Sequence, residues 1–139
     1  DGKQSTRAIH LALKDAKTNK EQVDYINFHG TSTIVNDKVE TLAVKNLFNS
    51  LSPKIPVSST KSMIGHPQGA SGGLGVSVSL LSLYNNFLTP TINQENPDPD
   101  CDLDYVPNKG REKNLNIAIS NCISFGSKNS ALVLGKFSR

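Results

Sequence analysis

Residues 61–83 read K-S-M-I-G-H-P-Q-G-A-S-G-G-L-G-V-S-V-S-L-L-S-L, and this stretch decides the fold. The part from Pro67 to Leu83 has the length of a helix, and proline is favoured in the first helical turn. Its glycines would weaken an exposed helix, but they allow a neighbouring backbone to approach closely in a buried one. The stretch therefore predicts a tightly packed central helix with His66 directly before it.

The segments around this helix alternate between helical and strand-like patterns. Apolar residues near helical spacing predict a helix over Thr6–Lys17. A second helix is expected to begin near Asn36 or Asp37, where a short polar side chain can cap free amides, with Glu40 in its first turn. Short apolar runs predict buried strands at three places: Val23–Phe28, Leu115–Ile123 and Ala131–Leu134. Helices that cross between buried strands indicate an α/β layered sheet, with the last two strands joined by a turn around Gly126.

Length and composition favour one globular domain. The chain has 139 residues, of which 36% are hydrophobic, so residues 1–139 can form one ordinary core but not two comfortable ones. The 15 basic and 12 acidic residues are scattered and form no dense Lys/Arg stripe, which argues against nucleic acid as a partner. Asn93–Asp104 is rich in Pro, Asn and Asp and predicts an irregular surface loop.

The expected compartment follows from the cysteines and from the absence of targeting signals. No stretch approaches the length of a membrane span, and the first residues resemble neither a signal peptide nor a transit peptide. Cys101 and Cys122 are not at metal-ligand spacing, so reduced thiols are the simplest interpretation. We expect a soluble, cytoplasmic protein, or an organellar one if a targeting segment precedes this chain.

Two short histidine motifs indicate the chemistry. They are F-H-G-T-S-T at 28–33 and K-S-M-I-G-H-P at 61–67. Each places an imidazole where an apolar run gives way to small and hydroxylated residues, so both rings are expected at strand or loop ends that line one cleft. Two neutral imidazoles in such a cleft could share one developing oxyanion.

The surroundings of each histidine support this interpretation. His66 is expected to lie against the positive end of the central helix, which disfavours a charged imidazolium. A neutral ring can still donate one N–H to an enolate or a tetrahedral oxyanion. His29 is expected at the carboxyl end of a strand, the usual place of ligand crevices in open α/β sheets. The hydroxyls of Thr31, Ser32 and Thr33 that follow could bind an extended polar ligand arm.

Several motifs in one order resemble a known family. They are H-G-T-S-T at 29–33, N-D-K-x-E-T at 36–41, S-S-T-K-S-M-I-G-H-P-Q-G-A-S-G at 58–72 and P-T-I-N-Q-E-N-P-D-P-D-C-D-L-D-Y-V-P-N at 90–108. Together they resemble the C-terminal half of a β-ketoacyl-acyl carrier protein synthase of the type II, KAS I/II-like class. The resemblance covers nearly the whole chain. It implies the C-terminal domain of a thiolase-like layered fold, with a mixed sheet and a buried central helix.

The resemblance also implies roles for individual residues. His29 and His66 correspond to the two catalytic histidines, and Lys61 to the lysine that organises the second of them. Thr31 and Thr33 match threonines that bind a phosphopantetheine arm. Phe125, in the terminal turn, matches an aromatic gate of the substrate pocket. Glu40 is assigned as a structural support and as a candidate partner of the lysine.

The implied reaction is a decarboxylative Claisen condensation that elongates a fatty acid or polyketide chain. Malonyl-acyl carrier protein loses carbon dioxide, and its enolate attacks an acyl thioester on a cysteine. That cysteine belongs to the family's N-terminal half, and neither Cys101 nor Cys122 lies in its motif. No cofactor is implied, because phosphopantetheine arrives on the acyl carrier protein. The implied partners are this carrier and either a second copy or an N-terminal ketosynthase half.

Two departures from the family pattern affect the expected site. Residues 123–128 read I-S-F-G-S-K where the family usually has a turn rich in F-G-F-G-G, so the gate and the pocket shape are open. Gly75 stands where elongation synthases usually have a glutamate facing the lysine. Glu40 is then the next candidate for the partner of Lys61.

Other interpretations stay open at this stage. Without the resemblance, His29 and His66 read as structural histidines, Lys61 as a surface lysine, Phe125 as core, and the two threonines as turn caps. A non-catalytic scaffold or chain-length factor is one rival function. A metal-dependent hydrolase that uses His29, His66 and Asp37 is another.

Overall fold

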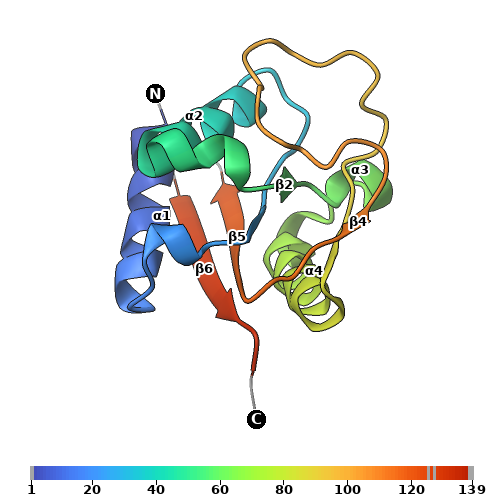
Figure 1. Cartoon of the computed structure of the whole chain (residues 1–139). Helices are drawn as coiled ribbons and strands as arrows, with labels where there is room; N and C mark the ends of the chain where they lie inside the picture. The colour runs from blue at the N-terminus through green and yellow to red at the C-terminus, as the bar shows by residue number, and fades with distance from the viewer. Residues whose placement is uncertain (1, 125, 127, 138–139) are drawn as a thin grey trace.

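The computed structural model describes residues 2–124, 126 and 128–137. These residues form helices and strands in alternation along the chain (Figure 1). The longer helices and the strands are α1 (Lys3–Asp15), β1 (Tyr25–Asn27), α2 (Asn36–Phe48), β2 (Val57–Ser58), α3 (Lys61–Ile64), α4 (Ser71–Asn85), β3 (Phe87–Leu88), β4 (Arg111–Glu112), β5 (Ile117–Ser124) and β6 (Lys128–Gly135). Short 3₁₀ turns lie at η1 (Lys20–Gln22), η2 (Asn49–Lys54) and η3 (Gln68–Ala70).

The main sheet is mixed, as the sequence resemblance implied. Its strand order is β2-β1-β5-β6. β1 runs parallel to both β2 and β5, and Ile26 pairs with Val57 on one side and with Ile119 on the other. β5 and β6 form an antiparallel hairpin. Because β1 and β2 are parallel neighbours, the segments that leave their carboxyl ends begin at the same edge of the sheet.

Helices cover both faces of this sheet. Figure 1 shows α1 and α2 on one side of β5 and β6, and α3 with α4 on the other. Side chains alternate accordingly along β1, because successive residues of a strand point to opposite faces. Ile26 packs in the cluster that contains Ile9 of α1 and Phe48 of α2, whereas Tyr25 packs in the cluster that contains Leu83 of α4. The prediction of an α/β layered fold is confirmed.

The predicted close packing of the central helix is found on one of its faces. A Cβ atom added to Gly75 would lie 2.8 Å from Ser120 Oγ and 3.2 Å from Asn27 Oδ1, so α4 approaches β5 and β1 as only a glycine allows. The opposite face of α4 is open. Leu81 is 59% exposed and Tyr84 is 79% exposed, and Leu74 and Leu80 share this face of the helix with them. In this chain the central helix is therefore buried on one side only.

Several element boundaries differ from the sequence prediction. The first helix begins at Lys3 and ends at Asp15, the first strand is confined to Tyr25–Asn27, and α4 begins at Ser71 after a 3₁₀ turn. The expected cap of α2 by Asn36 or Asp37 is wrong. Instead Thr33 Oγ1 accepts the backbone N–H of Asn36, because the side chains of Asn36 and Asp37 hydrogen-bond to each other.

The loop predicted over Asn93–Asp104 has no regular structure and lies against α2. Ion pairs from Lys38 to Asp98 and Asp100, and from Lys45 to Asp102, fasten it there. No helix among the described residues is long and apolar enough to cross a membrane.

We predict that residues 1–139 self-associate when they are produced alone, because the exposed apolar face of α4 favours contact with a second copy. Changing Leu81 and Tyr84 together to Gln should shift the chain towards monomer in size-exclusion chromatography with light scattering. Leu11→Gln is the matched control, since Leu11 is 50% exposed on α1, away from this face. A monomeric unmodified chain, or an equal effect of the control, would contradict the prediction.

Candidate active site

The two histidine motifs meet at the carboxyl edge of β1 and β2. His29 follows β1 by two residues, and Lys61 opens α3 three residues after β2. The rings of His29 and His66 lie with their centroids 5.3 Å apart and their planes at 82°. The two imidazoles are therefore neighbours in the structure, and their shared catalytic role stays a prediction.

His29 is held in a nearly solvent-free position. Its residue surface is 6% exposed, and its backbone N–H donates to Glu40 Oε1 at 2.8 Å. Its ring Nδ1 is buried and has no hydrogen-bond partner among the described residues. Burial, helped by the nearby charges of Lys61 and His66, lowers the pKa of His29 from 6.5 to about 4. The ring is therefore neutral near pH 7.

His66 is held by the start of the η3–α4 segment, as the sequence predicted. The backbone N–H of Gln68 donates to its Nδ1 at 3.0 Å. An Nδ1 that accepts this bond carries no hydrogen, so the Ser71 hydroxyl, 3.1 Å from the same atom, must also donate to it. In the neutral ring the hydrogen is then on Nε2, which is left as a donor for a ligand.

Glu40 supports the loop that carries His29. Its side chain is fully buried, and its two oxygens accept the backbone N–H groups of His29 at 2.8 Å and Gly30 at 2.9 Å. The side-chain amides of Asn121 and Asn36 add bonds of 3.2 and 3.4 Å. Burial outweighs these four donors and raises the pKa of Glu40 from 4.5 to about 7.

Lys61 is half-buried at the same edge. Burial lowers the pKa of Lys61, and the charges of Glu40 and Cys122 oppose this effect. Gly75, where the resemblance led us to look for a glutamate, instead contacts Ser120 and Asn27. Glu40 is thus the carboxylate that acts electrostatically on Lys61, as proposed from the sequence.

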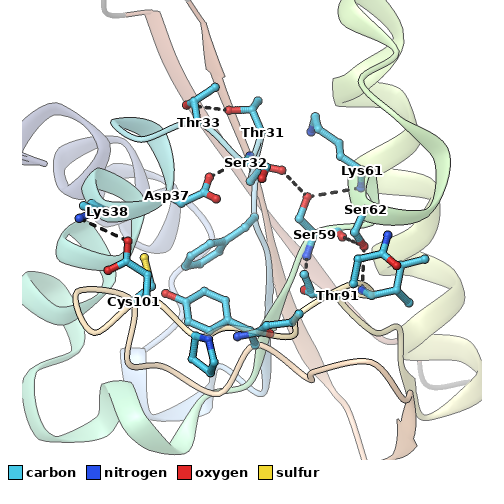
Figure 2. Close-up of a pocket in the computed structure, with 18 of the residues that line it drawn as sticks. Thr31, Ser32, Thr33, Asp37, Lys38, Ser59, Lys61, Ser62, Thr91 and Cys101 are labelled. Atoms are coloured by element: carbon cyan, nitrogen blue, oxygen red, sulfur yellow. Dashed lines mark hydrogen bonds and ion pairs between the residues drawn. The ribbon is translucent and has the colours of Figure 1, made fainter.

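An open cavity of about 770 Å³ is lined by His66, whereas His29 lies behind its wall. Thr31, Thr33 and Lys61 also line it (Figure 2). The two threonine hydroxyls lie 3.2 Å apart, and Thr33 Oγ1 also accepts the N–H of Asn36. Thr33 therefore caps the helix and faces the cavity at once, while Thr31 keeps an exposed hydroxyl.

The rival metal site lacks a suitable ligand set in the described ranges 2–124, 126 and 128–137. No three His, Cys, Asp or Glu side chains come together there in a way that could hold one metal ion. Asp37 Oδ1 instead accepts bonds from the backbone N–H of Ser32 and the side chain of Asn36. The hydrolase interpretation that joined Asp37 to the two histidines is therefore wrong.

A family comparison identifies the class of protein to which this site belongs. The model of the β-ketoacyl synthase C-terminal domain matches residues 1–95 of the chain. The chain belongs to the β-ketoacyl synthase family.

Curated relatives of this ketosynthase chain are similar over almost its whole length. It is 47% identical over 137 residues to 3-oxoacyl-[acyl-carrier-protein] synthase 2 of Synechocystis sp., covering 99% of this chain and 33% of the relative. It is 44% identical over 137 residues to the enzyme of the same name from Staphylococcus aureus, with the same two coverages. The chain therefore spans about a third of the length of these relatives.

Solved ketosynthase structures share its fold. The structure titled the ishigamide ketosynthase/chain length factor superposes with a TM-score of 0.95 at 37% identity, covering 99% of this chain and 34% of that one. A β-ketoacyl synthase from Burkholderia phymatum superposes with a TM-score of 0.93 at 34% identity, with coverages of 99% and 33%. The thiolase-like layered fold expected from the sequence is confirmed.

Phe125 and the two cysteines remain from the sequence analysis. Phe125, the expected gate, lies outside the described residues. Cys101 lines the cavity from the loop that Lys38 and Lys45 fasten to α2, whereas Cys122 lies on β5. Ser71 was missed as a site residue. The motif G-A-S-G at 69–72 contains it, but nothing in the spacing shows that the Ser71 hydroxyl turns back to the ring of His66.

We predict that Glu40 makes folding less favourable as the pH rises. Since its folded pKa is raised above the unfolded value, the native state keeps a proton that the unfolded chain loses, and this contribution to stability falls between pH 4.5 and about 7. His29 has the opposite sign, because its lowered pKa adds stability as the pH rises from about 4 to 6.5. The wild-type profile therefore combines two opposing effects.

The comparison of wild type with Glu40→Gln isolates the carboxylate. In the polypeptide that carries this chain, the variant should gain roughly 3 kcal/mol relative to wild type between pH 4.5 and 7. Chemical denaturation across this range measures it, with Glu21→Gln, an exposed carboxylate, as control. Parallel wild-type and Glu40→Gln profiles would contradict the prediction.

Proposed function

We propose that this chain supplies the His/His/Lys part of the active site of a 3-oxoacyl-acyl carrier protein synthase. The reaction is the decarboxylative condensation of an acyl thioester with malonyl-acyl carrier protein. The observation that carries the proposal is the pair of imidazoles with centroids 5.3 Å apart, of which His66 lines a cavity of about 770 Å³. Membership of the β-ketoacyl synthase family supports the same reaction class.

The proposed role of both rings is to stabilise an enolate. When the bond between the malonyl carbon and its carboxylate breaks, carbon dioxide leaves and the electron pair moves into the thioester carbonyl oxygen. His66 offers an Nε2–H to this oxygen because its Nδ1 is already occupied by two donors. His29 is neutral and offers its single N–H without releasing a proton. Two donors then share one negative charge.

In the proposed second half of the reaction, the enolate carbon attacks the acyl group. A carbon–carbon bond forms at the acyl carbonyl, and the cysteine thiolate that held this group leaves. We place that cysteine in the part of the enzyme that precedes residues 1–139, because neither Cys101 nor Cys122 lies in the family's nucleophile motif. The charge of Lys61 acts on His29, and the charge of Glu40 acts on Lys61. The proposed role of Lys61 is to organise His66.

The cavity suits an extended thioester arm. Thr31 and Thr33 line it together with His66, and their hydroxyls lie 3.2 Å apart. We propose that they bind the phosphopantetheine of a carrier protein, with no cofactor resident in the chain. One related structure is titled a type II PKS acyl-carrier protein in complex with its ketosynthase, at 38% identity and a TM-score of 0.93. This supports an acyl carrier protein as partner.

The proposed condensation elongates either a fatty acid or a polyketide chain. Identity is 44–47% to the two curated 3-oxoacyl-acyl carrier protein synthases and 38% to the structure whose title names a type II PKS. Residues 1–139 are proposed to be the C-terminal domain of the enzyme, paired with an N-terminal half and acting in a homodimer. A cytoplasmic location stays a prediction.

We predict that His66→Ala in the whole enzyme slows condensation by roughly 100-fold or more, because one oxyanion donor is lost. Acylation of the cysteine precedes the enolate, so its rate should stay within about two-fold of wild type. Radiolabelled acyl transfer and malonyl-carrier decarboxylation measure the two steps separately. His10→Ala is the control, since His10 is exposed on α1.

Two outcomes would overturn the assignment. Equal losses in acylation and condensation would mean that His66 does not act on the enolate. Unchanged malonyl decarboxylation in both His29→Ala and His66→Ala would favour the non-catalytic scaffold or chain-length factor.

A further inference from the structure

The hydroxyl of Ser59 joins the two segments that carry the histidines. Backbone pairing between β1 and β2 ends where Phe28 N–H donates to Ser58 C=O at 2.8 Å. Beyond this point, one chain turns towards His29 and the other towards Lys61. Ser59 Oγ–H donates to Gly30 C=O at 2.8 Å, and the same oxygen accepts the backbone N–H of Lys61 at 3.4 Å.

The fit around this hydroxyl is tight. A Cβ atom added to Gly30 would lie 2.4 Å from Ser59 Cβ, and Gly30 has a φ of +41°, which disfavours any side chain there. Ser59 is 7% exposed, and its own N–H donates to Thr91 Oγ1 at 3.1 Å. Figure 2 shows Ser59 between the Thr31 segment, Lys61 and Thr91. Ser59 is therefore held by Thr91 and Lys61 in addition to its bond to the His29 loop.

We propose that Ser59 is a positioning residue that sets the separation between His29 on one segment and Lys61 and His66 on the other. Its hydroxyl has no part in the chemistry itself, since its hydrogen is given to Gly30 and its oxygen accepts from Lys61. This inference rests on the proposed condensation. A shift of about 1 Å between two groups that act on one oxyanion is enough to cost up to about 100-fold in rate.

Ser62 offers a matched control in the same turn. Its hydroxyl donates to Ser59 C=O at 3.0 Å and accepts the N–H of Ile92 at 3.0 Å. It therefore makes as many hydrogen bonds as the Ser59 hydroxyl but none to the His29 loop. A loss that comes from general destabilisation of this turn should appear in both serine variants.

The test measures kcat and KM for condensation in the whole enzyme that carries this chain. Ser59→Ala should lower kcat by roughly 10-fold or more, with KM for malonyl-carrier protein within about three-fold of wild type. Cysteine acylation should be unchanged. Ser59→Thr, which keeps the hydroxyl, should restore most of kcat, and Ser62→Ala should keep kcat within about three-fold. Equal kcat losses in the Ser59 and Ser62 alanine variants, or no rescue by threonine, would overturn the proposal.

A second pair of variants covers the case in which Ser59→Ala does not fold. Ser59→Cys keeps a side chain of similar shape with a weaker donor. Its kcat should therefore be lower than that of wild type and of Ser59→Thr, but the loss should be less than tenfold. Ser62→Cys is its control. A wild-type kcat for Ser59→Cys would contradict the proposal. His66→Ala measured in parallel distinguishes a failure of the proposed function from a failure of the role proposed for Ser59. If His66→Ala keeps the condensation rate of wild type, the proposed function is overturned.

Discussion

The buried carboxylate of Glu40 is the interaction on which the rest of the site depends. It reaches from α2 to the two backbone N–H groups of His29 and Gly30 and to the side chain of Asn121 on β5. An unpaired carboxylate in this position would be very unfavourable, so the loop after β1 can take only conformations that present both N–H groups to it. The backbone of His29 is thereby held on the α2 side, and its ring is left to meet His66.

The two imidazoles lie in different surroundings. Burial is the main cause of the lowered pKa of His29, and the positive charge of Lys61 adds to it. His66 is exposed in this chain, and its ring nitrogen instead accepts two donors at the start of η3 and α4. Lys61 links the two regions, since its charge acts on His29 while Glu40 acts on Lys61.

Sequence reasoning succeeded where periodicity and strand ends carry the information. The meeting of His29 and His66 was predictable, because parallel neighbouring strands end at one edge of a sheet. Glu40 was expected in the first turn of α2, but a charged residue gives no periodic sign that it is fully buried. The bond from Ser59 to Gly30 joins residues 29 positions apart, and no local pattern marks such a partner. At the start of α2, the backbone N–H of Asn36 donates to Thr33 Oγ1. The sequence could not show this, because several neighbouring polar side chains can accept from the same N–H and only the tertiary geometry decides between them.

The open face of α4 connects the assembly of the protein to the chemistry of the site. His66 precedes this helix by five residues, and Leu74, Leu80 and Leu81 continue the helix with exposed apolar side chains. Leu74 lies in the first turn of α4, and Ser71 of the same turn is 3.1 Å from the ring of His66. A protein surface that covered Leu74 would therefore lie near His66, and a hydrogen bond to a developing charge gains strength where water is excluded. Packing of the start of α4 is thus physically linked to the oxyanion role that we propose for His66.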